Sequence, residues 1–334
     1  MCFRLGTGTV GSVPRPAATR DRSRPADRLT ALAAVTTVLL WASAFVVIRS
    51  VGHALAPGPL AFTRLLTGTL VLSVLALRGR RRLPRGRPLG LLVGYGVVWF
   101  AGYTVVLNAA ERHLDAGTAS LLVNVAPVLV AVAAGLLFAE GFPRPLIVGL
   151  LVAVGGVLVI SLGSRGGGVG DGIGVALALA AAVLYGAGVL LQKVTLRSVD
   201  AVTATWLGCA AGALATAPFA GQAWSQLAAA PARDVLGVVF LGVGPTAVAF
   251  TTWAYALSRT DAGRMAATTL TVPAIAVLLS WLTLGEVPTP LGLVGGALCL
   301  TGVAVTRLRS RAVGQPVASP SSPRPVPDFG RTRS

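Results

Sequence analysis

The chain has 334 residues, of which 54% are hydrophobic and only 12% are charged, and its mean hydropathy is +0.78. So little polar surface cannot cover a water-soluble globule, and the composition therefore predicts an all-α integral membrane protein. The net charge of +17 does not indicate nucleic-acid binding, because the basic residues gather between apolar runs, as topology signals and contacts for anionic lipid headgroups do.

The two ends of the chain differ from the rest. Residues 1–28 and 310–334 are rich in Arg, Pro and Ser and have no apolar periodicity, so we expect a disordered leader and a disordered tail. The first apolar run follows a basic leader and contains Ala42-Ser43-Ala44, which is also typical of a cleaved signal peptide. Because the run stays apolar past that site, we expect a retained helix.

Ten apolar runs predict ten transmembrane helices, at residues 29–48, 57–77, 89–109, 115–138, 145–162, 172–193, 200–220, 234–257, 262–284 and 289–307. With a cytoplasmic amino terminus, 23 Lys and Arg residues lie in cytoplasmic segments. External loops hold only Arg49, Arg112, Arg165 and Arg233. This asymmetry obeys the positive-inside rule and predicts a cytoplasmic-membrane protein with both termini in the cytoplasm.

An internal repeat is the most specific signal in the sequence. Ala116-Gly117, Pro127, Glu140, Gly149 and Gly156 recur 146 positions later as Ala262-Gly263, Pro273, Glu286, Gly295 and Gly302. Asp115 likewise matches Asp261, and Trp41 to Arg49 matches Tyr185 to Lys193 at an offset of 144. The repeats, 29–162 and 172–307, hold five helices each, and because five is odd the second is inverted, as in secondary transporters.

Three motifs carry a resemblance to a known family. They are Trp41-Ala-Ser-Ala-Phe-Val-Val-Ile-Arg49, Pro59-Leu-Ala-Phe-Thr-Arg64, and the paired Pro to Gly-Glu blocks that end at Glu140 and Glu286. Over residues 29 to 307 the chain resembles the EamA-type transporters of the drug/metabolite transporter superfamily, although Ala139 stands where the second copy has Gly285. The resemblance implies ten helices, cytoplasmic termini and export of metabolites or amino acids, and it leaves the substrate open.

Nine residues are candidates for the substrate pathway: Trp41, Arg64, Tyr103, Asn124, Pro127, Tyr185, Trp253, Thr269 and Pro273. Arg64 is the only charge well inside a span, so it either serves function or snorkels and sets the helix position. Pro127 and Pro273 predict paired kinks that free the carbonyls of Val123 and Thr269.

The polar and aromatic candidates are less specific. Asn124 needs partners, from a neighbouring helix or from a ligand. Trp41, Tyr103, Tyr185 and Trp253 lie deeper than interfacial aromatic residues do, and the resemblance implies that they face a central cavity. Many such aromatics only fill space between helices.

The acidic residues give little sign of chemistry. Glu140 and Glu286 end helices at opposite membrane faces, where they either form a symmetric gate or, as we favour, order the following turns. No acidic residue falls clearly within a predicted span, so a buried carboxylate for proton coupling is not visible. Cys2, Cys209 and Cys299 lack metal-ligand spacing, and we expect no disulfide framework, no metal and no cofactor.

The leading interpretation is a secondary transporter that exports small metabolites, amino acids or drug-like solutes by alternating access. A membrane enzyme is the first alternative, but clustered His, Asp or Glu are missing from the sequence, and we predict no catalytic residues. A lipid scramblase is the second. The expected partners are a small-molecule substrate and membrane lipids, with no nucleic acid, and a homodimer stays an open alternative.

Overall fold

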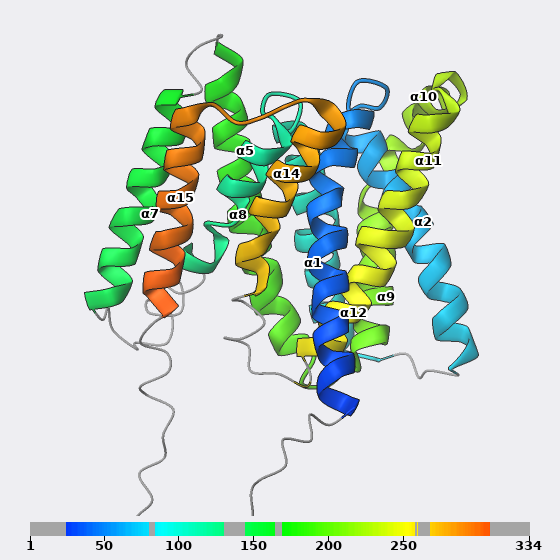
Figure 1. The fold of residues 1–334 in the computed structure, drawn as a ribbon. Coiled ribbons are helices and arrows are strands. Elements are labelled where there is room, and N and C mark those ends of the chain that lie inside the picture. Colours follow the sequence, from blue (N-terminus) through cyan, green and yellow to red (C-terminus); the bar gives the residue numbers. More distant parts are fainter. Residues whose placement is uncertain are drawn as a thin grey trace, which may run out of the picture.

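The computed structural model describes residues 25–79, 84–129, 144–163, 169–257, 259 and 268–307, and within these ranges every regular element is a helix (Figure 1). The first half contains α1 (Pro25–Val51), α2 (Pro57–Arg78), α3 (Arg87–Tyr95), the π-helix η1 (Gly96–Tyr103), α4 (Thr104–Ala110), α5 (Ala116–Val123) and α7 (Arg144–Gly163). The second half contains α8 (Val169–Thr195), α9 (Ala201–Ala215), the 3-10 helix η3 (Ala217–Phe219), α10 (Ala220–Ala229), α11 (Ala232–Leu241), the π-helix η4 (Gly242–Val248), α12 (Ala249–Leu257), the 3-10 helix η5 (Thr269–Thr271), α14 (Val272–Leu284) and α15 (Pro290–Arg307).

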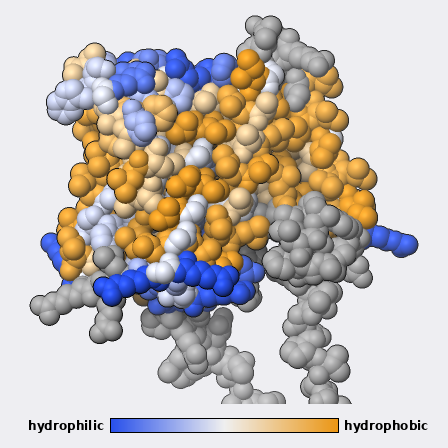
Figure 2. Space-filling model, turned by 180° about the vertical axis from the view of Figure 1, so that it is seen from behind, coloured by the Kyte–Doolittle hydropathy of each residue, from blue (hydrophilic) through white to orange (hydrophobic). Residues whose placement is uncertain are grey.

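The helices form an apolar bundle of membrane dimensions. Within the described residues five helices are long and apolar enough to cross a bilayer: Arg28–Val51, Pro57–Arg78, Arg87–Ala110, Gly172–Thr195 and Ala232–Leu257. The pair Ala201–Ala215 and Ala217–Ala229, bent by 52°, makes a sixth if it counts as one span. Four shorter apolar helices complete the bundle, and Figure 2 shows a broad hydrophobic band with hydrophilic residues at its upper and lower edges.

The upper face in Figure 1 carries α10 and the connections from α1 to α2, α4 to α5 and α14 to α15. The lower face carries the start of α1 and the end of α15. α1 begins at Pro25, so the last four residues of the predicted leader are helical. The rest of the leader and the whole predicted tail lie outside the described residues, as do Glu140 and residues 261–263.

The seventh predicted helix, 200–220, is wrong at its end. α9 stops at Ala215, and α10 follows where a loop was expected. The break has a local cause, because Pro218 has no backbone N–H to continue the helical hydrogen bonds. The Gly212 carbonyl accepts both the backbone N–H and the hydroxyl of Thr216, at 3.0 and 2.9 Å, in the last turn of α9. α10 then packs near the start of α2, where the side chain of Gln226 accepts a hydrogen bond from the backbone N–H of Ala56 at 2.9 Å.

Two π-helices interrupt the third and eighth predicted helices, and the sequence analysis did not predict them. η1 starts at Gly96 and η4 at Gly242, which are 146 positions apart. Gly96 packs against Gly208 of α9, and a Cβ on Gly242 would lie 2.8 Å from the carbonyl oxygen of Arg64 in α2. Since Arg64 and Gly208 are equivalent at the offset of 144, these are two matching contacts between the halves, each formed by a π-helix of one half and a helix of the other.

The helices α7 and α15 touch through their backbones. A Cβ on Gly156 would lie 2.5 Å from the carbonyl oxygen of Gly295, and one on Gly302 would lie 2.5 Å from that of Gly149. Gly156 and Gly302 are equivalent at the offset of 146, as are Gly149 and Gly295, so exchanging the two halves converts one contact into the other. A pseudo-twofold axis therefore passes between two antiparallel helices, perpendicular to them. Small residues permit this approach, which matters because lipid supplies no hydrophobic force between helices.

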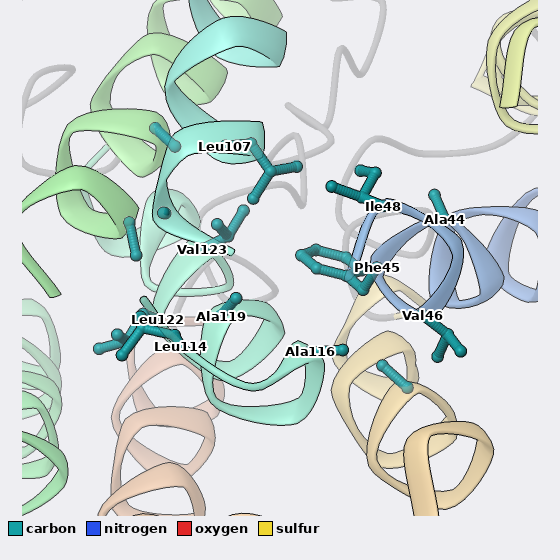
Figure 3. Close-up of a cluster of buried hydrophobic side chains, with 14 of the residues drawn as sticks. Ala44, Phe45, Val46, Ile48, Leu107, Leu114, Ala116, Ala119, Leu122 and Val123 are labelled. Atoms are coloured by element: carbon teal, nitrogen blue, oxygen red, sulfur yellow. The ribbon is translucent and has the colours of Figure 1, made fainter. Parts of the chain in front are cut away.

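The apolar core fixes α1 against α4 and α5. Phe45 and Ile48 of α1 belong to one buried cluster with Leu107 of α4 and with Leu122 and Val123 of α5 (Figure 3). All five side chains are at most 5% exposed. This packing sets one wall of the cavity described next.

Candidate functional site

An aromatic cavity lies between the two halves of the chain. Seven of the nine predicted pathway residues line it: Trp41, Arg64, Tyr103, Asn124, Pro127, Tyr185 and Thr269. The other two lie behind its wall. Trp253 packs on Trp41, with ring centroids 5.0 Å apart, and Pro273 is buried near the start of α14.

The wall also contains aromatic residues that the sequence analysis missed. Trp99 packs edge-on against Tyr185 and Phe250, with ring centroids 5.3 and 5.2 Å away. Phe250 in turn contacts Trp41 at 5.5 Å, so the rings connect helices of both halves. Nothing in the sequence distinguished Trp99 from packing aromatics, because its position depends on the unpredicted π-helix η1.

Arg64 is held at one end of its guanidinium group. The side chain is 5% exposed, and its Nε donates to Oγ1 of Thr246 over 2.8 Å. That hydroxyl donates to the carbonyl of Leu241 at 2.8 Å, which Pro245 cannot bind because it lacks an N–H. Nη1 of Arg64 is buried and has no hydrogen-bond partner among the described residues.

Arg64 therefore does not snorkel to the membrane surface. One nitrogen is anchored to the second half, while another is left without a protein partner beside the cavity. A guanidinium group in this position can bind a carboxylate, and leaving it without one is costly.

The two proline positions hold breaks in their helices. α5 ends at Val123, three residues after Ser120, and helical turns resume only before Pro127. Before Pro273 the backbone forms the 3-10 helix η5. Interruptions are thus present at both predicted kinks, in the described parts of the predicted helices 115–138 and 262–284, because a missing N–H and a ring clash open the backbone ladder in both halves.

Asn124 sits in the first of these breaks. Its amide donates to the carbonyl of Ser120, four residues earlier in the same chain segment, over 3.0 Å. It lines the aromatic cavity, and the described residues show no bond from its amide to another helix. This hydrogen bond of Asn124 is therefore local and does not join two helices.

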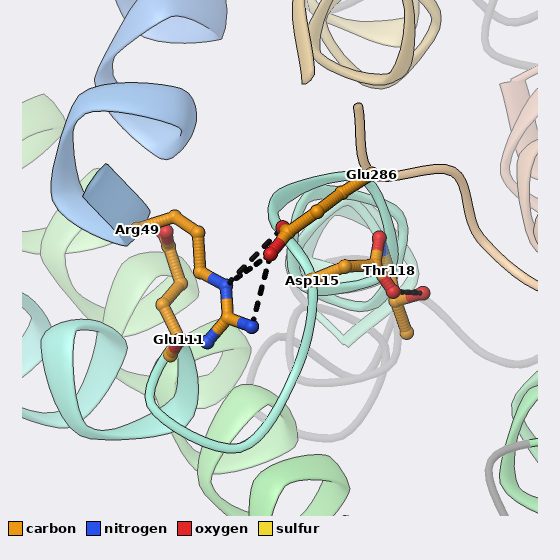
Figure 4. A network of polar contacts seen from close by, with 5 residues as sticks. All are labelled: Arg49, Glu111, Asp115, Thr118 and Glu286. Carbon is orange, nitrogen blue, oxygen red and sulfur yellow. Dashed lines mark hydrogen bonds and ion pairs between the residues drawn. The ribbon is translucent and has the colours of Figure 1, made fainter. Parts of the chain in front are cut away.

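A second, polar cavity opens at the upper face, with a volume of about 650 Å³. We call it the vestibule, and its wall consists of Arg49, Ser50, Gly52, His53, Glu111, Arg112, Arg233, Asp234, Leu284 and Glu286. Nε of Arg49 lies 3.1 and 3.2 Å from the two carboxylate oxygens of Glu286, and Nη2 lies 3.1 Å from Oε1 (Figure 4). This ion pair joins the end of α1 to the segment after α14, across the two halves.

The backbone places Glu286 opposite Arg49. α14 ends at Gly285, whose φ of +68° lies in the left-handed region that glycine adopts without strain. The chain reverses there, and the next residue meets the guanidinium. Glu286 thus follows a helix end and also forms an ion pair with the other half of the chain. This ion pair supports a gate at the upper face, while its counterpart Glu140 lies outside the described residues.

Glu111 is the buried acid that the sequence analysis did not find. It directly follows α4, is 2% exposed, and has both carboxylate oxygens buried without a hydrogen-bond partner among the described residues. Burial raises the pKa of Glu111 well above its ordinary value, and the charges of Arg49 and Arg64 oppose this rise. The residue stands two positions beyond the predicted helix 89–109, where a loop acid gives no signal of burial.

The sequence matches a family profile twice, over residues 28–162 and 172–308, and the family is described as EamA-like transporters. The chain belongs to the EamA-like transporter family. It is accordingly a multi-pass membrane protein that transports small molecules, and the two matched segments contain the two halves described above.

Relatives within the EamA-like family have more specific names. A probable terminal-alkyne amino-acid exporter of Streptantibioticus cattleyicolor is 33% identical over 278 residues, covering 83% of this chain and 93% of its own. A probable amino-acid metabolite efflux pump of Salmonella typhimurium is 25% identical, with 81% and 92% covered. One crystal structure shares the fold with a TM-score of 0.57 and 23% identity, over 84% of this chain and 98% of that one.

Proposed function

We propose that the protein exports small amino acids and related metabolites with apolar side chains, by alternating access between its two halves. The observation that carries the proposal is the Nη1 of Arg64, buried and unpartnered beside a cavity with aromatic walls. A carboxylate satisfies the guanidinium, and an apolar side chain suits Trp41, Tyr103 and Tyr185. The names of the two relatives point to the same class of solute.

The size of the aromatic cavity supports a closed state. Its volume is about 50 Å³, whereas sites for small organic ligands enclose roughly 300 Å³ or more. A solute enters only if the walls separate, and the walls come from both halves. In this proposal the helix breaks at Pro127 and Pro273 act as hinges for the movement. The ion pair between Arg49 and Glu286 closes the upper entrance.

We further propose ten membrane-spanning helices with both termini in the cytoplasm. The five long helices, the bent pair and the four shorter apolar helices support this count. The basic segments between residues 78 and 87 and after Val305 support a cytoplasmic lower face and contact with anionic lipids. The vestibule then opens to the outside. The boundaries of the two repeats, at residues 29–162 and 172–307, remain predictions. The formation of a homodimer is also still a prediction.

The test is counterflow in proteoliposomes. Vesicles that hold purified protein and unlabelled L-norvaline are diluted into labelled L-norvaline, and L-leucine and L-phenylalanine are tested in the same way. We expect saturable uptake by the native protein. Arg64→Gln should reduce this uptake by at least about tenfold, because the substitution removes one charge-assisted hydrogen bond to the solute. Arg197→Gln, which removes an exposed arginine outside the cavity, is the matched control and should leave uptake unchanged.

Two results would overturn the proposal. Absence of counterflow for all three amino acids with correctly folded protein would exclude this solute class. Equal uptake by the native protein and Arg64→Gln would remove Arg64 from the pathway. Movement of labelled phospholipid between leaflets, without amino-acid flux, would favour a scramblase instead.

A further inference from the structure

Glu111 is the most unusual acid among the described residues. It is 2% exposed, both of its carboxylate oxygens are buried without a hydrogen-bond partner among those residues, and it belongs to the wall of the vestibule. A buried carboxylate that stays ionised without hydrogen bonds is strongly disfavoured, so such a group takes up a proton. Asp115, four residues on, differs because it accepts hydrogen bonds from the N–H and hydroxyl of Thr118 at 2.8 and 2.6 Å.

The groups that face Glu111 come from several elements. The cations are Arg49 of α1 and Arg64 of α2, and the anions are Asp115 before α5 and Glu286 after α14. Tyr103 of η1 also acts on it electrostatically. The remaining charged or titratable residues of the vestibule wall are His53, Arg112, Arg233 and Asp234.

Arg49 connects Glu111 to the closure of the vestibule. Its Nη1 donates to the backbone carbonyl of Glu111 over 2.9 Å, while Nε and Nη2 bind the carboxylate of Glu286 (Figure 4). In this conformation the guanidinium forms an ion pair with the Glu286 carboxylate and contacts Glu111 through its backbone carbonyl, while the charge of Arg49 also acts on the Glu111 carboxylate. A negative charge on Glu111 would compete with Glu286 for Arg49.

We propose that Glu111 is the proton-binding group of this carrier and that its protonation holds the upper entrance closed. A proton from vestibule water forms an O–H bond on the Glu111 carboxylate, which becomes a neutral acid, and Arg49 is left to Glu286. Loss of that proton to water restores the anion and draws Arg49 from Glu286. Proton-dependent closure of the entrance does not depend on the proposed function. The coupling of proton movement to solute movement does rest on it.

The sign of the coupling follows from burial. In the closed conformation burial raises the pKa of Glu111, whereas in an open vestibule water surrounds the carboxylate and its pKa returns toward the ordinary range. The closed form therefore binds the proton more tightly. Acid on the vestibule side favours closure, and alkali favours opening.

Carbodiimide labelling tests the proton directly. Dicyclohexylcarbodiimide adds to protonated carboxylic acids in apolar surroundings and is retained as an N-acylurea, which peptide mass spectrometry locates. In the full-length protein at pH 7 we expect label on Glu111, decreasing as the pH rises, and none on Asp115 or Glu286. An unlabelled Glu111, or equal label on Glu286, would overturn the inference.

Thiol accessibility tests the coupling to closure. Ser50→Cys places a thiol in the vestibule wall of protein that also carries Cys2→Ser, and Cys209 and Cys299 are fully buried. The rate of maleimide labelling is measured against pH with Glu111 present and with Glu111→Gln. The ratio of the two rates cancels the titration of the thiol itself. We expect the labelling rate with Glu111 present, divided by the rate with Glu111→Gln, to be near one in acid and to rise several-fold in alkali. A ratio that stays constant with pH would contradict the coupling.

A gradient experiment separates this inference from the proposed function. A pH gradient should drive accumulation of L-norvaline by the native protein. Glu111→Gln should show counterflow at the rate of the native protein in acid, unchanged by pH, and should lose at least most of the gradient-driven accumulation. Equal accumulation by both proteins would overturn proton coupling with the exporter intact. If counterflow is absent from the native protein, the exporter proposal fails, and the carbodiimide and thiol measurements still decide the role of Glu111.

Discussion

Nε of Arg64 donates to Oγ1 of Thr246 over 2.8 Å, and this bond ties α2 of the first half to the π-helix η4 of the second. Thr246→Val keeps the shape of the side chain and removes the acceptor. We expect the KM for L-norvaline counterflow to rise roughly tenfold, since losing a buried bond to a charged group costs about 1–3 kcal/mol.

Thr251→Val is the matched control for this substitution. The hydroxyl of Thr251 donates to the carbonyl of Ala247, four residues earlier in the chain, and does not contact Arg64, so its loss should leave the KM close to the native value. A native KM for Thr246→Val would show that the bond does not orient Arg64.

The ion pair between Arg49 and Glu286 should control access to the vestibule. Glu286→Gln removes the negative charge, so the guanidinium loses most of its attraction and the closed form is weakened. We expect faster maleimide labelling of Ser50→Cys, and partial recovery when Arg49→Glu is combined with Glu286→Arg. Arg233→Gln is the control, because Arg233 pairs only loosely, at 3.5 Å, from an exposed position. Unchanged labelling in Glu286→Gln would exclude a gating role.

Protonation of Glu111 should also appear in the stability of the protein. The folded closed form binds a proton that the unfolded chain releases above about pH 4.3, the ordinary value for glutamate. Since the folded pKa is raised, this contribution is fully present at low pH and is lost as the pH rises through the folded pKa. The melting temperature should fall with pH across this window in the native protein. In Glu111→Gln the fall should be smaller, and identical slopes would argue against a raised pKa.

The backbone contact between α7 and α15 should tolerate no side chain. Gly156→Val places a branched side chain where a Cβ alone would lie 2.5 Å from the carbonyl oxygen of Gly295. We expect destabilisation of about 1–3 kcal/mol or more, seen as a lower melting temperature in detergent. The neighbouring Gly155→Val is the control, because a Cβ at Gly155 meets nothing within 4 Å. Equal melting temperatures for the two variants would contradict the packing.

The sequence predicted what depends on composition and repetition. Apolar runs located the helices, the duplication paired Pro127 with Pro273, and most of the pathway residues converge on the aromatic cavity. These features are local, or are repeated in the chain, so they can be read without a structure.

What escaped prediction depends on tertiary packing and on the path of backbone hydrogen bonds. Apolar periodicity does not distinguish an α turn from a π turn, so η1 and the position of Trp99 were missed. α10 was assigned to a loop because it is short and lies beyond the break at Pro218. Glu111 follows its helix like any polar residue in a loop, and its burial becomes visible only in the folded structure.

The contact between α7 and α15 has a consequence for how the two halves can move. The two helices lie together at one side of the bundle (Figure 1), and neither contributes a residue to the wall of the aromatic cavity. Their backbones meet without intervening side chains at two heights, which prevents sliding. We expect this pair, which contains the last described helix of each half, to stay together as a pivot while the remaining helices move in the proposed alternating access.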